Sequence, residues 1–173
     1  FRDIYLRGFQ IAVDEAQPWA VMTSYNKVNG TYVNQRKDAV TNILRDEWGF
    51  NGLVMSDWFA GNVMGDSESA AAQLNAGNDL IEPGAQKTNL QASVDAGSLT
   101  EAQVTQNAVH ILTQVQKSPS YNRYSFSNNP DLNAHAVLAR KAATEGMVLL
   151  KNNAALPIAD GKTLATFGVN QVN

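Results

Sequence analysis

Residues 52–58 read Gly52-Leu53-Val54-Met55-Ser56-Asp57-Trp58, and the fold class follows from this segment. The preceding Asn51-Gly52 pair is typical of a turn. Three consecutive apolar residues then predict a short strand that is buried on both faces. Strands of this kind occur in parallel sheets whose two faces are covered by helices, so the segment favours an α/β fold.

Short apolar runs alternate with helical patterns along the first 117 residues. We expect strands at residues 19–23, 53–55 and 79–81. We expect helices over 1–16, through 40–48 ending at Gly49, from a Ser67 cap to Gly77, through 90–94 ending at Gly97, and from a Thr100–Gln103 capping box. This order of elements indicates parallel strands joined by right-handed crossovers.

Two of these segments carry a specific expectation about burial. The apolar residues of 1–16 recur at helical spacing, which predicts one buried face. The nearly continuous apolar run 19–23 predicts a strand covered on both faces. A polar loop follows, in which Asn29-Gly30 is a turn pair.

Periodicity alone leaves two architectures open, an open doubly wound sheet and a closed (β/α)8 barrel. Three strands are too few for either, and a full barrel takes about 250 residues. We therefore expect residues 1–117 to be the C-terminal part of a (β/α)8-type barrel that begins before Phe1. The composition turns to Ser, Asn, Pro and Tyr over 118–131, which predicts a linker. Residues 132–173 then open a second domain, with a helix at 132–145 and strands at 147–150 and 164–168.

Composition excludes several classes of function. Thirteen basic against sixteen acidic residues argue against a nucleic-acid partner. No cysteine is present, so disulfides, thiol nucleophiles and Cys-ligated metals are excluded. No apolar run is long enough for a membrane span. His110 and His135 have no partner at ligand spacing, and His110 lies off the apolar stripe of its helix, so we expect it to be solvated and expect no zinc site.

Candidate site residues follow from the ends of the expected strands, because sites in parallel α/β folds form there. Asp57 would be a carboxylate held on a rigid element, suited to a nucleophile or a metal ligand, although a helix cap or loop Asp is the alternative. Trp58 offers a flat apolar face to a pyranose ring, and the Tyr25 hydroxyl can donate to Asp57 and keep it ionised, unless Tyr25 is a half-buried rim residue. Glu82 is either a second active-site carboxylate or a solvated loop residue, and Asp79 is expected to make a structural hydrogen bond.

Four separated motifs resemble glycoside hydrolase family 3. Residues 21–30 (VMTSYNKVNG) resemble its M-x-S-Y-N-x-V-N-G motif, and residues 44–58 (LRDEWGFNGLVMSDW) resemble L-R-x-x-W-G-F-x-G-x-V-x-S-D-W. Residues 76–80 (AGNDL) look like its A-G-x-D element, and residues 142–157 are similar to the opening of the family's second, α/β-sandwich domain. The motifs occur in the family's order over nearly the whole chain.

The resemblance implies a retaining β-glycosidase, most family members being β-glucosidases or β-xylosidases. Asp57 matches the family's nucleophile, Tyr25 the tyrosine beside it, and Trp58 the aromatic wall of the sugar subsite. Glu82 stands where members often carry Met before a proline, which changes the expected leaving-group subsite, while Trp58 weighs against amino-sugar substrates. The general acid/base would lie outside these residues, in the remainder of the same polypeptide.

The expected function is therefore release of terminal β-linked glucose or xylose from oligosaccharides or β-glucosides by double displacement, without cofactor or metal. The expected partners are a small glycoside and the rest of the chain, not nucleic acid or a membrane, and the family implies a secreted or periplasmic protein. Two alternatives stay open. One is a non-catalytic carbohydrate-binding barrel that has lost its acid/base, and the other is a metal-dependent hydrolase that uses Asp57 and Glu82 as ligands.

Overall fold

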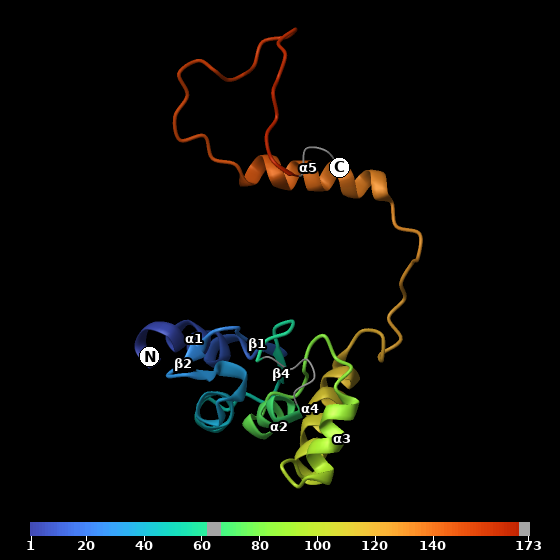
Figure 1. Ribbon diagram of the computed structural model, residues 1–173. Helices are drawn as coiled ribbons and strands as arrows, with labels where there is room; N and C mark the ends of the chain where they lie inside the picture. Colours follow the sequence, from blue (N-terminus) through green and yellow to red (C-terminus); the bar gives the residue numbers. More distant parts are fainter. Residues whose placement is uncertain (62–66, 170–173) are drawn as a thin grey trace. The chain divides into compact units, whose positions relative to one another are not determined.

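The computed structural model describes residues 1–61 and 67–169. The chain divides into two compact units, Phe1–Tyr124 and Ser125–Asn173 (Figure 1). Each unit is described by itself below.

A parallel strand pair lies at the centre of the first unit. β1 (Ala20–Thr23) and β4 (Leu53–Ser56) run parallel, with Thr23 opposite Ser56. The segment between the two strands includes a ten-residue helix, as is usual for the crossover between parallel strands. The predicted α/β class and the parallel pairing are confirmed.

The prediction of a strand at 79–81 is wrong. Its only sheet contact among the described residues is one isolated parallel bridge between Met55 and Leu80. The amides of Asp79 and Leu80 both donate to the carbonyl of Val54, at 2.7 and 3.1 Å, so the ladder does not advance along the chain. A turn follows at once, closed by the Gly84 amide on the carbonyl of Ile81.

The helices of the first unit begin and end close to their predicted positions. They are η1 (Arg2–Leu6), α1 (Arg7–Ala16), η3 (Asp38–Glu47), α2 (Ser67–Ala76), α3 (Lys87–Asp95) and α4 (Glu101–Lys117). The structure also contains a short helical turn that the sequence did not predict, η2 (Val33–Gln35). Gly49, Gly77 and Gly97 follow three of them with φ of 67°, 96° and 74°, as expected of C-terminal caps. The Thr100 side chain accepts from the Gln103 amide at 3.1 Å, which is one half of the predicted capping box. The predicted Ser67 cap lies outside the described side chains.

The polar loop after β1 forms a small antiparallel hairpin. β2 (Lys27–Val28) pairs with β3 (Thr31–Tyr32) across the predicted turn. Asn29 and Gly30 both have positive φ, 51° and 84°, which is the backbone of a type I′ turn.

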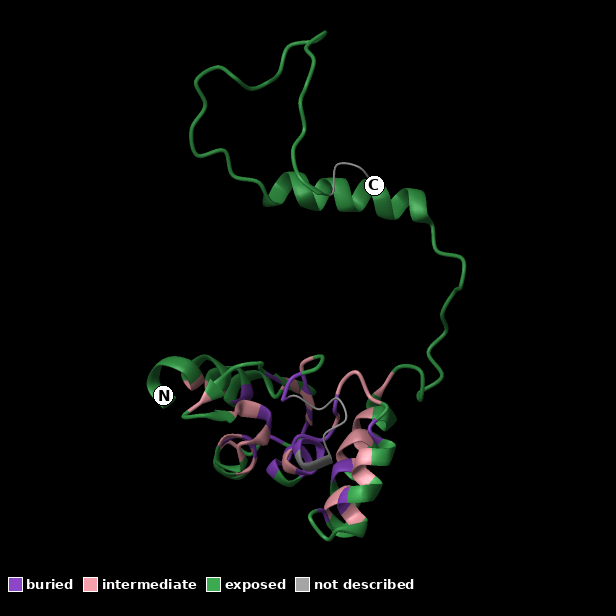
Figure 2. Cartoon of the chain, viewed as in Figure 1, coloured by how far each residue is buried: buried purple, intermediate pink, exposed green. Residues whose placement is uncertain are grey.

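The core consists of two clusters of apolar side chains. One contains Val13, Val40, Leu44, Phe50 and Val54, and it packs α1 and η3 against β4. The other contains Ala70, Ala71, Leu74, Ile81 and Leu99, and it joins α2 to the segments that follow it. Figure 2 shows the buried residues concentrated around β4 and α2.

Two predictions of burial are wrong. Within 1–16 only Val13 is buried, and Ile4 is 80% exposed. On β1, Met22 is 54% exposed, so the strand is not covered on both faces. Among the described residues β1 pairs with β4 alone, and no second strand pairs with its other edge.

In its described residues, the second unit contains one helix, α5 (Leu132–Gly146), as predicted for 132–145. Asp131 caps it by accepting from the Ala134 amide at 2.9 Å. The strands expected at 147–150 and 164–168 are wrong: neither segment is a strand, and Leu150 is 92% exposed. An extended segment needs a neighbour for its backbone groups, and the described part of this unit supplies none. In the described ranges, no helix is both long and apolar enough to cross a membrane.

Candidate active site

Asp57 is the first residue after β4, and hydrogen bonds hold its main chain on two sides. Its amide donates to the carbonyl of Thr23 at the end of β1, at 3.2 Å. Its carbonyl accepts from the Ala60 amide at 3.1 Å and so closes a tight turn. One carboxylate oxygen accepts from the Trp58 amide at 2.7 Å. The carboxylate is half-buried and lies at the carboxyl end of the parallel strands, where sites of this fold class form.

Ser56 has no exposed surface, and its hydrogen bonds join the end of β4 to residues 80–82. Its hydroxyl accepts from the Glu82 amide at 2.9 Å, and its own amide donates to the carbonyl of Leu80 at 2.9 Å. The end of β4 is thereby tied to the neighbouring chain segment, so the residue before Asp57 serves position rather than chemistry.

Tyr25 lies beside Asp57, as the sequence predicted, but its hydroxyl has a different hydrogen-bond partner. The hydroxyl donates to the carbonyl of Trp58. Partial desolvation raises the pKa of Tyr25, and the negative charge of the nearby Asp57 carboxylate raises this pKa further. The Tyr25 hydroxyl proton therefore lies on the Trp58 carbonyl, close to the negative charge of Asp57.

An exposed aromatic surface adjoins the carboxylate. Trp58 is 55% exposed, and the ring of Phe59 meets it edge to face with 6.0 Å between centroids. Such a surface suits the flat C–H face of a pyranose ring. The sequence predicted Trp58 for this role and did not identify Phe59, whose only signal was its place one residue further along.

Glu82 reaches the site through its main chain. Its amide donates to the Ser56 hydroxyl at 2.9 Å, and its carbonyl accepts from the Phe59 amide at 3.1 Å. The side chain is half-buried. In the described ranges, no group of three or more His, Asp or Glu side chains is placed to hold a metal ion.

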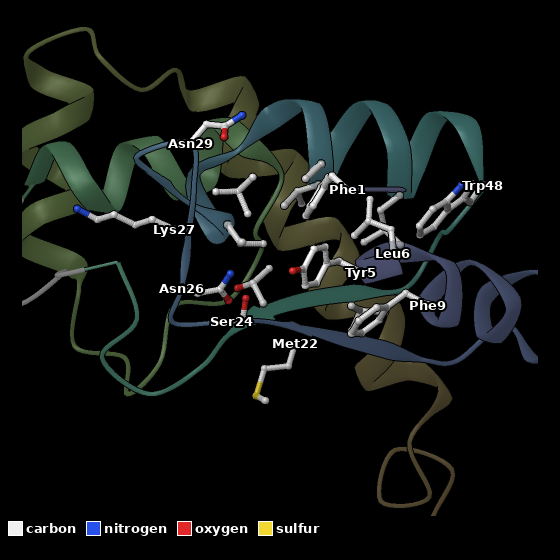
Figure 3. A pocket seen from close by; sticks show the side chains of 17 residues that line it. Phe1, Tyr5, Leu6, Phe9, Met22, Ser24, Asn26, Lys27, Asn29 and Trp48 are labelled. Atoms are coloured by element: carbon white, nitrogen blue, oxygen red, sulfur yellow. The ribbon is translucent and has the colours of Figure 1, made fainter. Parts of the chain in front are cut away.

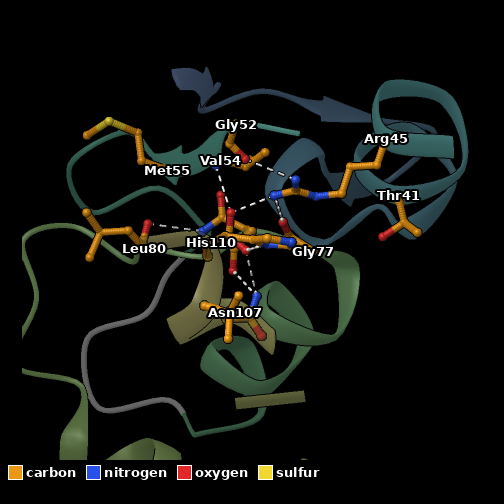
Figure 4. A network of polar contacts seen from close by, with 12 residues as sticks. Thr41, Arg45, Gly52, Val54, Met55, Gly77, Leu80, Asn107 and His110 are labelled. Atoms are coloured by element: carbon orange, nitrogen blue, oxygen red, sulfur yellow. Dashed lines mark hydrogen bonds and ion pairs between the residues drawn. The ribbon is translucent and has the colours of Figure 1, made fainter. Parts of the chain in front are cut away.

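A buried ionic network lies behind the site (Figure 4). One oxygen of Asp79 accepts from Arg45 at 2.5 Å and from the Val54 amide at 2.9 Å. The other contacts Asn107 at 3.1 Å and Nδ1 of His110 at 2.7 Å. The expected structural hydrogen bond of Asp79 is confirmed. The expectation that His110 is solvated is wrong, because its side chain is three-quarters buried against this carboxylate.

Thr23 and Asn78 make a second buried contact below the strand ends. The Thr23 hydroxyl contacts the side-chain oxygen of Asn78 at 3.1 Å and the carbonyl of Met55 at 3.2 Å. The Asn78 amide group donates to the carbonyl of Leu80 at 3.2 Å. Both side chains are buried, so β1, β4 and the segment after α2 are held in one register below Asp57.

A separate hollow of about 690 Å³ lies along β1 and the N-terminal helices (Figure 3). Aromatic rings of Phe1, Tyr5, Phe9 and Trp48 line it, together with Met22. Asp57, Tyr25 and Trp58 do not belong to its lining, so the hollow is distinct from the strand-end site.

Comparison with known proteins gives one family and a consistent set of relatives. The profile described as "Glycosyl hydrolase family 3 N terminal domain" matches residues 1–114. A curated "Beta-glucosidase" of Rhizobium radiobacter is 40% identical over 181 residues, which cover 98% of this chain and 21% of the relative. An "Exo-alpha-(1->6)-L-arabinopyranosidase" of Bifidobacterium longum is 38% identical over 165 residues, which cover 92% of this chain and 20% of that relative.

Solved structures agree with the sequence relatives. The structure of beta-glucosidase 3B from Thermotoga neapolitana in complex with glucose superimposes with a TM-score of 0.73 at 42% identity, over 91% of this chain and 23% of that one. A GH3 beta-glucosidase from Bifidobacterium adolescentis gives a TM-score of 0.65 at 38% identity, over 87% of this chain and 22% of that one. The chain thus spans about a fifth of the length of the proteins that it matches.

Proposed function

This chain belongs to glycosyl hydrolase family 3, and we propose that the protein carrying it is a retaining, exo-acting β-glycosidase with Asp57 as its nucleophile. One observation carries the proposal: a half-buried carboxylate stands at the end of a parallel strand, next to an exposed indole and a tyrosine hydroxyl. The strand holds the carboxylate in place, and Trp58 offers a surface on which a sugar ring can lie.

The proposed reaction is double displacement. Asp57 attacks the anomeric carbon while a carboxylic acid outside these residues protonates the leaving oxygen, and a covalent glycosyl-enzyme forms. Water then attacks this intermediate, and the same acid acts as base, so the configuration is retained. Retaining enzymes place the two carboxyl groups about 5–5.5 Å apart. The partner acid should therefore lie at this distance from Asp57 in the complete protein.

The proposed substrate is a small β-glucoside, or a β-xyloside, from which the terminal sugar is released. The relatives support a pyranoside but include enzymes named for two sugars, β-glucosidases and an α-L-arabinopyranosidase. A panel of β-glucoside, β-xyloside and α-L-arabinopyranoside substrates would rank them by kcat/KM. The proposal expects the β-glucoside first.

The proposal includes the place of this chain in the whole protein. Residues 1–117 would be the C-terminal part of a (β/α)8 barrel, 118–131 a linker, and 132–173 the start of an α/β-sandwich domain. The proposed location is secreted or periplasmic, and no cofactor enters the reaction. The boundary between the two compact units, at Tyr124 and Ser125, supports a linker at 118–131 because it lies within that range.

A covalent trap tests the nucleophile. The complete protein is incubated with an activated 2-deoxy-2-fluoro glucoside, digested, and mapped by mass spectrometry. The proposal expects one sugar on the peptide containing Asp57 and none after Asp57→Asn. A label on another residue overturns the assignment, whereas sugar binding with no label and no turnover indicates a carbohydrate-binding protein.

A further inference from the structure

We propose that Tyr25 and the main chain of Glu82 hold the peptide between Trp58 and Phe59 in a flipped orientation, and that this peptide sets the position of the Trp58 indole. We refer to the two hydrogen bonds on this peptide as the peptide clamp. Only the expected effect of the clamp on sugar binding rests on the proposed function. It makes Tyr25 a positioning residue of Trp58, beyond its place beside Asp57.

The clamp acts on a single peptide group from two sides. The carbonyl of Trp58 accepts from the Tyr25 hydroxyl, and the amide of Phe59 donates to the carbonyl of Glu82 at 3.1 Å. Tyr25 follows β1, and Glu82 follows the segment bridged to the other side of β4. The peptide is therefore held by both neighbours of the strand that carries Asp57.

The backbone of Phe59 shows that this orientation has a cost. The Ala60 amide closes a turn on the carbonyl of Asp57 at 3.1 Å, and Phe59 is the third residue of that turn with φ of 63°. A positive φ at this position is the geometry of a type II turn, which normally has glycine there. For a residue with a side chain, the left-handed conformation is populated about fivefold to thirtyfold less than the right-handed one.

The alternative conformation is close at hand. Types I and II differ mainly in a rotation of their central peptide by about 150–170°, and a type I turn would give Phe59 an ordinary negative φ. That rotation would turn the Trp58 carbonyl away from Tyr25 and the Phe59 amide away from Glu82. Each hydrogen bond shifts the equilibrium between the two turn conformations by about twofold to tenfold, so two of them are enough to offset the backbone penalty of Phe59. Strain of this kind persists where the surroundings over-determine it, often at functional sites.

The consequence for the site is a fixed indole. The clamped peptide joins Trp58 to Phe59, and the Phe59 ring packs edge to face against the Trp58 indole. Since both side chains are about half exposed, little packing holds the indole apart from this contact and the backbone. A peptide flip would therefore move the surface on which the sugar is proposed to lie.

Fluorine NMR on the complete protein labelled with fluorotryptophan tests the clamp, with Trp58→Phe assigning the Trp58 resonance. Tyr25→Phe removes one hydrogen bond and should shift or split this resonance. The decisive comparison places Tyr25→Phe in two backgrounds that both lack the ring: Phe59→Gly, which tolerates positive φ, and Phe59→Ala, which does not. The resonance should move in the alanine background and stay in place in the glycine background.

The matched control is Tyr121→Phe, which removes a hydroxyl from an exposed tyrosine after α4 and should leave the Trp58 resonance unchanged. Equal movement in the two backgrounds, or movement in neither, overturns the clamp. Phe59→Gly and Phe59→Ala, each with and without Tyr25→Phe, are then titrated with glucose, and Tyr25→Phe should raise the dissociation constant at least about threefold wherever it moves the resonance. A resonance that follows the prediction without glucose binding leaves the clamp standing and refutes the proposed function instead.

Discussion

Nδ1 of His110 lies 2.7 Å from one oxygen of Asp79, a carboxylate whose side chain has no exposed surface. The second oxygen of this carboxylate binds Arg45 and the amide of Val54, so one buried anion joins α4, η3 and β4. Because Asp57 directly follows β4, the network helps to position the proposed nucleophile.

Asp79→Asn should destabilise the protein by about 3–5 kcal/mol. The substitution keeps the shape but leaves the guanidinium of Arg45, whose side chain is only 11% exposed, without its buried counter-ion. Denaturant unfolding of the complete protein measures the change. Asp46→Asn is the matched control, since Asp46 is exposed on η3 and its loss should stay within about 0.5 kcal/mol. Equal effects of the two substitutions would contradict a structural role for the network.

The sequence predicted part of this network and missed the rest for a physical reason. Asp79 was expected to make a structural hydrogen bond because it begins an apolar segment. His110 was misplaced because helical periodicity identifies apolar faces only. Asn107 and His110 are three positions apart on α4 and point at the same carboxylate. In a sequence, such a polar face looks the same as one that faces water.

The difference between local and non-local contacts explains which strands were predicted correctly. Helices form from contacts within three or four residues, so the segments that became η3, α3, α4 and α5 could be located from local patterns. Strands need a partner. Residues 53–56 pair with β1 and form β4, whereas the equally apolar 147–150 meets no strand among the described residues and stays irregular.

Asp57→Asn should abolish turnover, with kcat falling by at least about 10³-fold, because asparagine keeps the shape and loses the anionic nucleophile. Glucose should still bind within about threefold of the parent affinity, since the Trp58 indole and the hydrogen bond from Tyr25 to the Trp58 carbonyl remain. Steady-state kinetics and a glucose titration of the complete protein measure both quantities. Turnover near the parent value would refute Asp57 as nucleophile.

Gly52→Ala should cost about 1–3 kcal/mol of unfolding free energy. A Cβ at this position would lie 2.5 Å from the carbonyl oxygen of Trp19 and 2.5 Å from the Phe50 ring, so the turn before β4 would have to move. Gly8→Ala in α1 is the matched control. Nothing lies within 4 Å of its added Cβ, and the change should stabilise the helix by about 0.5–1 kcal/mol. Thermal and denaturant unfolding should move in opposite directions for the two variants, and a shift of the same sign in both would contradict the close approach at Gly52.

Tyr25 should titrate above its ordinary pKa of 10.0, because partial desolvation and then the charge of Asp57 both favour the neutral phenol. Comparing the ultraviolet phenolate absorbance of the parent with that of Tyr25→Phe isolates this one group. In Asp57→Asn the pKa of Tyr25 should fall toward its ordinary value without reaching it, since desolvation, the larger cause, remains. The folded state holds this proton more tightly than the unfolded state, so the contribution to stability is present below pH about 10 and is lost as pH rises through the folded pKa. A Tyr25 pKa that is the same in the parent and in Asp57→Asn would show that the carboxylate does not face the hydroxyl, and the proposed site would then lose one of its three members.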